Sequence, residues 1–182
     1  MRVLIAYGTT EGQTGRIAEE LRARLEQRGV VADAVDLEKL TPTATAYDRI
    51  VVAGSIHVGK YQKEVARFVS ANVGLLNEVP SWFVGVSMSE ASGEGSDGHA
   101  EAQGLIDRFT GEHGWRPKRS VSLAGALGYR EYNFVKRLVM KRIAKGKGQP
   151  TDTSRDYEFT DWGAVDRLAD EIADSARPEW LG

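Results

Sequence analysis

Five mainly apolar runs, each four or five residues long, recur along the chain and are rich in β-branched or aromatic residues. They cover residues 3–6, 31–35, 50–53, 82–86 and 121–124. Runs of this length and composition are typical of β-strands. The first, third and fourth are apolar on successive residues, which is the pattern of strands that are covered on both faces. We therefore predict five strands, of which at least three are buried in a sheet.

Between these runs, apolar residues return with the period of an α-helix. The sets that share a helical face are Ile17, Ala18, Leu21 and Leu25; Tyr61, Val65, Phe68 and Val69; Leu105, Ile106 and Phe109; and Trp162, Val165, Leu168, Ala169 and Ile172. Thr160 precedes the last set and is predicted as its N-cap. Strands that alternate with helices indicate a parallel sheet with helices on both sides. We expect one α/β domain over residues 1–182, a doubly wound, flavodoxin-like sheet of five parallel strands in the order 2-1-3-4-5.

Two segments depart from this alternation. Residues 87–98 are rich in Ser, Gly and acidic residues, which predicts a mobile loop after the fourth strand. Residues 130–148 form an additional, strongly basic stretch with helical periodicity, predicted as an insertion between the fifth strand and the last helix.

Composition excludes several kinds of chemistry. The 182 residues carry a net charge of -2, which gives no support for nucleic-acid binding. Cysteine is absent, which excludes disulfides, thiol nucleophiles and Cys-ligated zinc or iron–sulfur sites. Redox chemistry would therefore depend on a bound cofactor. No run approaches the ~20 apolar residues of a membrane span, and no signal peptide is recognisable, so a cytoplasmic location is expected.

The turn between the first strand and the first helix is the strongest candidate binding motif. Its residues include Thr9, Thr10, Glu11, Gly12, Gln13 and Thr14. Free N–H groups at a helix N-terminus favour an anion, and three hydroxyls with flexible glycines suit a phosphate held by neutral donors. The spacing fits neither G-x-G-x-x-G nor a Walker motif. The alternative is a polar turn in which Thr14 caps the helix.

Three more loops follow strands at the same edge of the predicted sheet. They contain Ser55, Ile56, His57, Val58 and Gly59 after the third strand, Val86, Ser87, Met88 and Ser89 after the fourth, and Gly125, Ala126, Leu127, Gly128 and Tyr129 after the fifth. Small residues beside a ring or a sulfur suit a flat heterocycle held between loops. Together with the phosphate turn, these loops predict one pocket.

Several motifs resemble those of a known family. They are Thr9-x-x-Gly12-Gln13-Thr14, Ser55-Ile56-x-x-Gly59-x-Tyr61, Trp115-Arg116-Pro117, Gly125-Ala126-Leu127-x-Tyr129 and Thr151-Asp152-Thr153 with Thr160-Asp161-Trp162. The chain resembles, nearly end to end, the menaquinone-dependent protoporphyrinogen oxidase branch of the flavodoxin superfamily. The departure from the family pattern is the acidic, Gly-rich composition of residues 87–98, where a more basic stretch is expected.

This resemblance implies an enzyme of haem biosynthesis that binds FMN non-covalently and oxidises protoporphyrinogen IX with a quinone as acceptor. It implies that residues 9–14 bind the phosphate, that residues 55–59 and 86–89 lie beside the isoalloxazine, and that residues 125–129 lie behind it. Two alternatives remain open: an electron-transfer flavodoxin, which the acidic 87–98 segment favours, and a quinone reductase that uses a nicotinamide cofactor.

Histidine and serine residues offer few further sites. His57 could donate to the flavin or relay a proton, and the alternative is that it faces solvent. His99 and His113 are expected at the surface, and the histidines do not form the H-E-x-x-H pattern of a zinc site. Ser96 does not lie in G-x-S-x-G, which argues against a hydrolase.

The basic stretch has two interpretations. Residues 130–147 contain seven Lys or Arg residues against one Glu, and Arg137, Lys141 and Lys145 form a stripe on one helical face. The stretch is either a packed helix with a solvated basic side or a peripheral contact with anionic lipid, where a lipophilic quinone is found.

Overall fold

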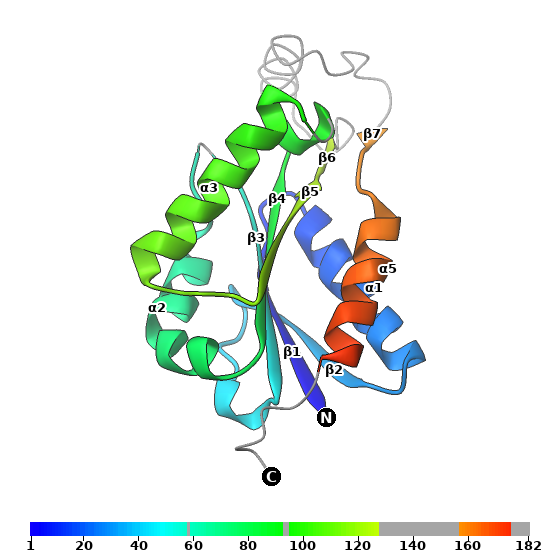
Figure 1. Cartoon of the computed structure of the whole chain (residues 1–182), viewed down its shortest axis with the longest axis vertical. Coiled ribbons are helices and arrows are strands. Elements are labelled where there is room, and N and C mark those ends of the chain that lie inside the picture. The colour runs from blue at the N-terminus through cyan, green and yellow to red at the C-terminus, as the bar shows by residue number, and fades with distance from the viewer. Residues whose placement is uncertain (58, 93–94, 128–156, 176–182) are drawn as a thin grey trace.

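The computed structural model describes residues 1–57, 59–92, 95–127 and 157–175. Its centre is a five-stranded parallel sheet in the order β2-β1-β3-β4-β5 (Figure 1). The strands are β1 (Arg2–Gly8), β2 (Val31–Asp36), β3 (Arg49–Ser55), β4 (Ser81–Ser87) and β5 (Arg119–Ala124). The predicted fold class and strand order are confirmed, and each strand contains the apolar run that predicted it.

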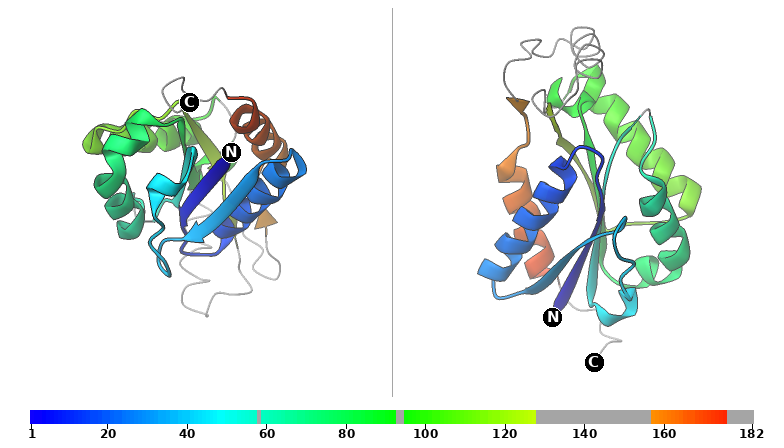
Figure 2. Two further views of the ribbon diagram at one scale, coloured as in Figure 1. Left: turned by 90° about the horizontal axis from the view of Figure 1, so that it is seen from below. Right: turned by 180° about the vertical axis from the view of Figure 1, so that it is seen from behind.

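Helices cover both faces of the sheet. α1 (Gln13–Gln27) and α5 (Trp162–Asp174) lie on one face, and α2 (Lys63–Glu78) and α3 (Asp97–His113) lie on the other (Figure 2). Short 3-10 turns, η1 (Ala44–Ala46) and η2 (Ser89–Ser92), lie in two of the connections. A two-stranded antiparallel ribbon of β6 (Ala126–Leu127) and β7 (Tyr157–Glu158) follows β5.

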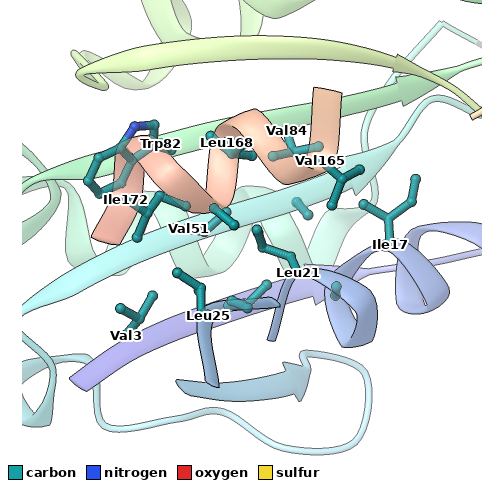
Figure 3. Close-up of a cluster of buried hydrophobic side chains, with 14 of the residues drawn as sticks. Val3, Ile17, Leu21, Leu25, Val51, Trp82, Val84, Val165, Leu168 and Ile172 are labelled. Carbon is teal, nitrogen blue, oxygen red and sulfur yellow. The ribbon is translucent and has the colours of Figure 1, made fainter. Parts of the chain in front are cut away.

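Each face of the sheet has its own core, as alternate side chains of a strand point to opposite faces. Val3, Val51 and Val84 pack against α1 and α5 (Figure 3). Leu4, Val52 and Phe83 pack against α2 and α3. Because β1, β3 and β4 are buried on both faces, they are apolar on successive residues.

Two local expectations need correction. The predicted loop at 87–98 ends earlier than expected, because Ser96 caps α3 by accepting from His99 N, and it contains the turn η2, where Ser87 Oγ accepts from Glu90 N. Thr160 is not the N-cap of α5. That cap is Asp161, which accepts from the N–H groups of Gly163 and Ala164, whereas the buried Thr160 hydroxyl donates to Ala124 O at 2.9 Å.

Some sequence predictions concern residues outside the described ranges. They are the basic insertion at 130–148, the Thr151-Asp152-Thr153 motif and the candidate binding residues Val58, Gly128 and Tyr129. Within the described ranges, no helix is long and apolar enough to cross a bilayer.

Candidate functional site

A cleft opens at the carboxyl ends of β1, β3, β4 and β5, where ligands of doubly wound sheets bind. Its lining consists of Thr9, Thr10, Glu11, Gln13, Thr14, Ser55, Ile56, His57, Val86, Ser87, Met88, Gly125 and Ala126. All of these were predicted as binding residues from the sequence. Four loops that are far apart in the chain therefore contribute to one cleft, as the strand order requires.

The turn after β1 leads directly into the N-terminus of α1. Gly12 is the N-cap residue and has φ 84°, a left-handed conformation that glycine adopts without strain. Its N–H donates to Thr9 Oγ1 at 2.9 Å. The first N–H groups of a helix have no partner within the helix, and no described side chain caps α1. The N-terminus of α1 therefore presents backbone N–H donors to the cleft.

Thr14 lies in the first turn of α1, in the cleft wall, and is 1% exposed. Its Oγ1 is buried and has no hydrogen-bond partner among the described residues. The alternative that Thr14 caps α1 is wrong, since Gly12 holds the cap position. A buried hydroxyl without a partner is costly unless a ligand satisfies it, so Thr14 fits a site for an anion.

Gln62, immediately before α2, contacts two residues of the cleft lining, and the sequence reasoning missed it. Its Nε2 donates to Thr10 Oγ1 at 3.0 Å and to Ser55 Oγ. Its Oε1 accepts from Ser55 N at 3.1 Å. One side chain thus connects the turn after β1 to the loop after β3. Nothing in the local pattern identifies Gln62, because its partners lie 7 and 52 residues away.

His57 lies at the cleft in a tight turn. Its N–H donates to Lys60 O at 2.8 Å, and Lys60 N donates back to His57 O at 3.2 Å. Gly59 completes the turn with φ 73°. The His57 side chain is exposed, while Ile56 N donates to Val86 O at 2.9 Å and fixes the loop against β4. The turn therefore places His57 in the lining of the cleft.

Other predicted residues lie apart from the cleft lining. Gly12 is exposed at the start of α1, and Gly59 borders a second cavity between α2 and α3, together with Tyr61 and Phe109. Ser89 is buried and donates to Glu101 Oε2 at 2.7 Å. Leu127 belongs to β6, beyond the lining residues Gly125 and Ala126.

One acidic side chain of the segment after β4 has a histidine partner. Glu90 lies 2.9 Å from His99 Nδ1, so its carboxylate has a partner that can carry positive charge.

His113 Nδ1 lies 2.8 Å from Phe109 O and is only partly exposed. Within the described part of the chain, no group of three His, Asp or Glu residues is placed to hold a metal ion.

Comparison with known proteins places the chain in a family. Residues 4–154 match the flavodoxin domain family. The chain is 34% identical over 174 residues to protoporphyrinogen IX dehydrogenase (quinone) of Escherichia coli strain K12, and the match covers 95% of each chain. It is 28% identical to the protein of the same name from Leishmania major, covering 94% of this chain and 74% of that one.

Solved structures agree on the fold. Oxidised flavodoxin 1 from Bacillus cereus matches with a TM-score of 0.57 at 11% identity, covering 97% of this chain and all of the other. A flavodoxin from the domain Archaea matches with a TM-score of 0.53 at 18% identity, covering 96% and 97%. The family match indicates a flavin-binding site. The chain belongs to the flavodoxin domain family and, within it, to the family of the protoporphyrinogen IX dehydrogenases (quinone).

Proposed function

We propose that the chain binds FMN non-covalently in this cleft and oxidises protoporphyrinogen IX with a quinone as electron acceptor. The observation that carries the proposal is the buried hydroxyl of Thr14, which has no partner among the described residues, beside the N-terminus of α1, which no described side chain caps. A phosphate would give that hydroxyl an acceptor and would occupy the positive end of the helix dipole.

The donors around this point are neutral. Thr9, Thr10, Thr14 and Ser55 bring hydroxyls to the cleft, and no Lys or Arg is among its described lining residues. An anion held here would depend on backbone N–H groups and hydroxyls. This chemistry suits the phosphate of FMN.

The flavin ring would lie along the carboxyl ends of β3, β4 and β5. Ile56 and His57, Val86 to Met88 and the backbone of Gly125 would border the ring, and Ser55 would lie nearer the phosphate turn, where its hydroxyl meets Gln62. When bound, the flavin supplies the redox chemistry by taking reducing equivalents from the porphyrinogen and passing them to the quinone. The chain orients the ring and limits water access. His57, at the mouth, is proposed to donate to the ring or to relay a proton.

The substrate assignment is supported by the relatives. The E. coli protein that matches 95% of this chain is named protoporphyrinogen IX dehydrogenase (quinone). Menaquinone is proposed as the acceptor, and the basic residues 130–147, which lie outside the described ranges, are proposed to contact an anionic membrane from the cytoplasmic side.

The test is an anaerobic assay of the FMN-loaded protein with protoporphyrinogen IX and a menaquinone analogue, in which porphyrin fluorescence reports turnover. Fluorescence that grows only when protein, FMN and quinone are all present supports the proposal. If the bound flavin can be reduced and reoxidised but porphyrin does not form, the chain is an electron carrier. A nicotinamide cofactor that reduces the quinone without porphyrinogen would identify a quinone reductase.

A further inference from the structure

The orientation of the Gln62 side-chain amide is fixed by the backbone of Ser55. A backbone N–H can only donate, so the Gln62 atom 3.1 Å from Ser55 N is the oxygen, Oε1. The opposite atom is therefore the nitrogen, Nε2. It faces Thr10 Oγ1 at 3.0 Å and also Ser55 Oγ.

This orientation decides the role of two hydroxyls. An amide nitrogen donates and cannot accept, so the oxygens of Thr10 and Ser55 accept from Gln62. Each hydroxyl has only one hydrogen, which must then point away from the amide. Both residues line the cleft, so both hydrogens are available to an acceptor inside it.

Two glycines of the sheet lie beside the Gln62 side chain. Gly8 of β1 and Gly54 of β3 are register partners. A Cβ at Gly8 would lie 3.3 Å from Gln62 Cβ, and a Cβ at Gly54 would lie 3.4 Å from Gln62 Oε1. A Cβ at these positions would first meet Val65 Cγ2 at 2.6 Å and Tyr61 Cδ1 at 3.0 Å. The two glycines therefore leave room for Val65 and Tyr61, and Gln62 packs beside them.

We propose that Gln62 is a positioning residue that presets the hydroxyls of Thr10 and Ser55 as donors to the phosphate of FMN. It does this through its amide nitrogen, while its oxygen holds the Ser55 backbone. This inference rests on the proposed function, because it requires a phosphate in the cleft.

The test is Gln62→Glu, which changes the amide nitrogen to oxygen at constant shape. The carboxylate can still accept from Ser55 N, but its second oxygen would accept from the hydroxyls and turn their hydrogens away from the phosphate. The loss of two charge-assisted hydrogen bonds, together with repulsion between the new carboxylate and the phosphate, should weaken FMN binding at least about 100-fold at pH 8. Fluorescence quenching during titration of the full-length apoprotein with FMN measures this change.

Two comparisons separate positioning from a merely structural role. Riboflavin lacks the phosphate, so Gln62→Glu should change its affinity little. A carboxylate near a phosphate has a raised pKa, so the ratio of variant to wild-type Kd for FMN should fall between about pH 8 and pH 5 as the carboxyl gains a proton and can donate. Equal weakening of FMN and riboflavin, or a ratio that does not depend on pH, would overturn the proposal.

Control variants distinguish a failure of the Gln62 proposal from a failure of the proposed function. Gln27→Glu makes the same substitution at an exposed position at the far end of α1 and should leave both affinities unchanged. Gln62→Met lacks both donor and acceptor and adds no charge, so it should weaken FMN about tenfold and spare riboflavin through lost positioning alone. Unchanged FMN affinity in the folded Gln62 variant overturns the role of Gln62. Equal binding of FMN and riboflavin by the wild type instead contradicts the phosphate site of the proposed function.

Discussion

The hydroxyl of Tyr61 occupies the space in which a side chain at Gly85 would begin, since a Cβ at position 85 would lie 2.5 Å from the Tyr61 oxygen. Gly85 pairs in register with Gly54, where a Cβ would lie 3.0 Å from Tyr61 Cδ1. The Tyr61 ring packs edge-on against Phe83 and Phe109, with centroids 5.0 and 4.9 Å away. Tyr61 therefore anchors the loop that carries His57 in a hollow of the sheet.

Gly85→Ala should destabilise the protein by on the order of 1–3 kcal/mol, because the new methyl group overpacks this hollow. Burial raises the pKa of Tyr61, and its hydroxyl has no hydrogen-bond partner among the described residues. Tyr61→Phe alone should therefore cost nothing or stabilise. In the double variant, the loss from Gly85→Ala should shrink without vanishing, because a Cβ at position 85 would also lie 2.9 Å from Ile106 Cγ1.

Urea unfolding of the two single variants and the double variant measures these effects as a double-mutant cycle. Strictly additive free energies, or a large loss from Tyr61→Phe alone, would contradict the predicted contact.

Thr14→Val should have opposite effects on the protein with and without FMN. The valine has nearly the same shape and removes a buried hydroxyl that has no partner among the described residues, so the apoprotein should gain about 1 kcal/mol of stability. FMN should bind more weakly, by roughly 1.5–3 kcal/mol, and Thr10→Ala combined with Thr14→Ala should weaken it further. Thermal unfolding measures the change in stability, and FMN titration measures the change in affinity. Full flavin retention in the double variant would exclude the phosphate assignment.

Asp161→Ala should lower the free energy of unfolding by about 1 kcal/mol at pH 7, because α5 loses its N-cap. The N–H of Ala164, together with Arg167 and the N–H of Gly163, holds the pKa of Asp161 below its usual range. This stabilisation is complete above the unfolded-state pKa and is lost as the pH falls through the lower folded-state value. The difference between variant and wild type should thus shrink below about pH 4.

Urea unfolding at several pH values checks the Asp161 prediction, with Asp161→Asn as the matched control, since asparagine also caps helices. A loss in Asp161→Asn as large as in Asp161→Ala would show that the cap geometry is not what stabilises α5.

His57→Ala should shift the flavin midpoint potential or flatten the pH dependence of turnover between about pH 5 and 8. The physical reason is that His57 lines the cleft, where its ring nitrogens could exchange a proton with the flavin. Because the side chain is exposed, the substitution should leave the stability of the protein unchanged. An unaltered potential together with an unaltered pH profile would leave His57 as a surface residue.

The basic stretch 130–147 should bind anionic vesicles at low salt and release them as salt rises. Each positive charge near an anionic leaflet contributes roughly 1 kcal/mol, screened beyond a Debye length of about 8 Å at physiological salt. Changing Arg137, Lys141 and Lys145 to Glu should abolish flotation with the vesicles and leave FMN in place. Equal, weak flotation of wild type and variant would remove the physical support for a membrane contact.

Much of the fold follows from local pattern. The runs at 3–6, 50–53 and 82–86 predict buried parallel strands because burial on both faces requires apolar side chains at successive positions. The strand order then brings the ends of β1, β3, β4 and β5 to one edge, so the residues that line the cleft could be predicted as a set. The turn around Gly12 could also be predicted as an anion site, because three hydroxyls and two glycines before a helix are typical of one.

The tertiary structure decided which polar side chains are available to the cleft and which make hydrogen bonds within the fold. Ser89 and Thr160 carry hydroxyls near the site, yet one bonds Glu101 and the other bonds Ala124 O. Gln62 has no local signature, and its role exists only because Thr10 and Ser55 lie beside it in the folded chain. The sequence pattern determines the helices and strands, because their periodicity depends on residues close together in the chain. Hydrogen-bond partners and close approaches such as that of Tyr61 to Gly85 depend on distances between residues remote in the chain, and only packing sets these.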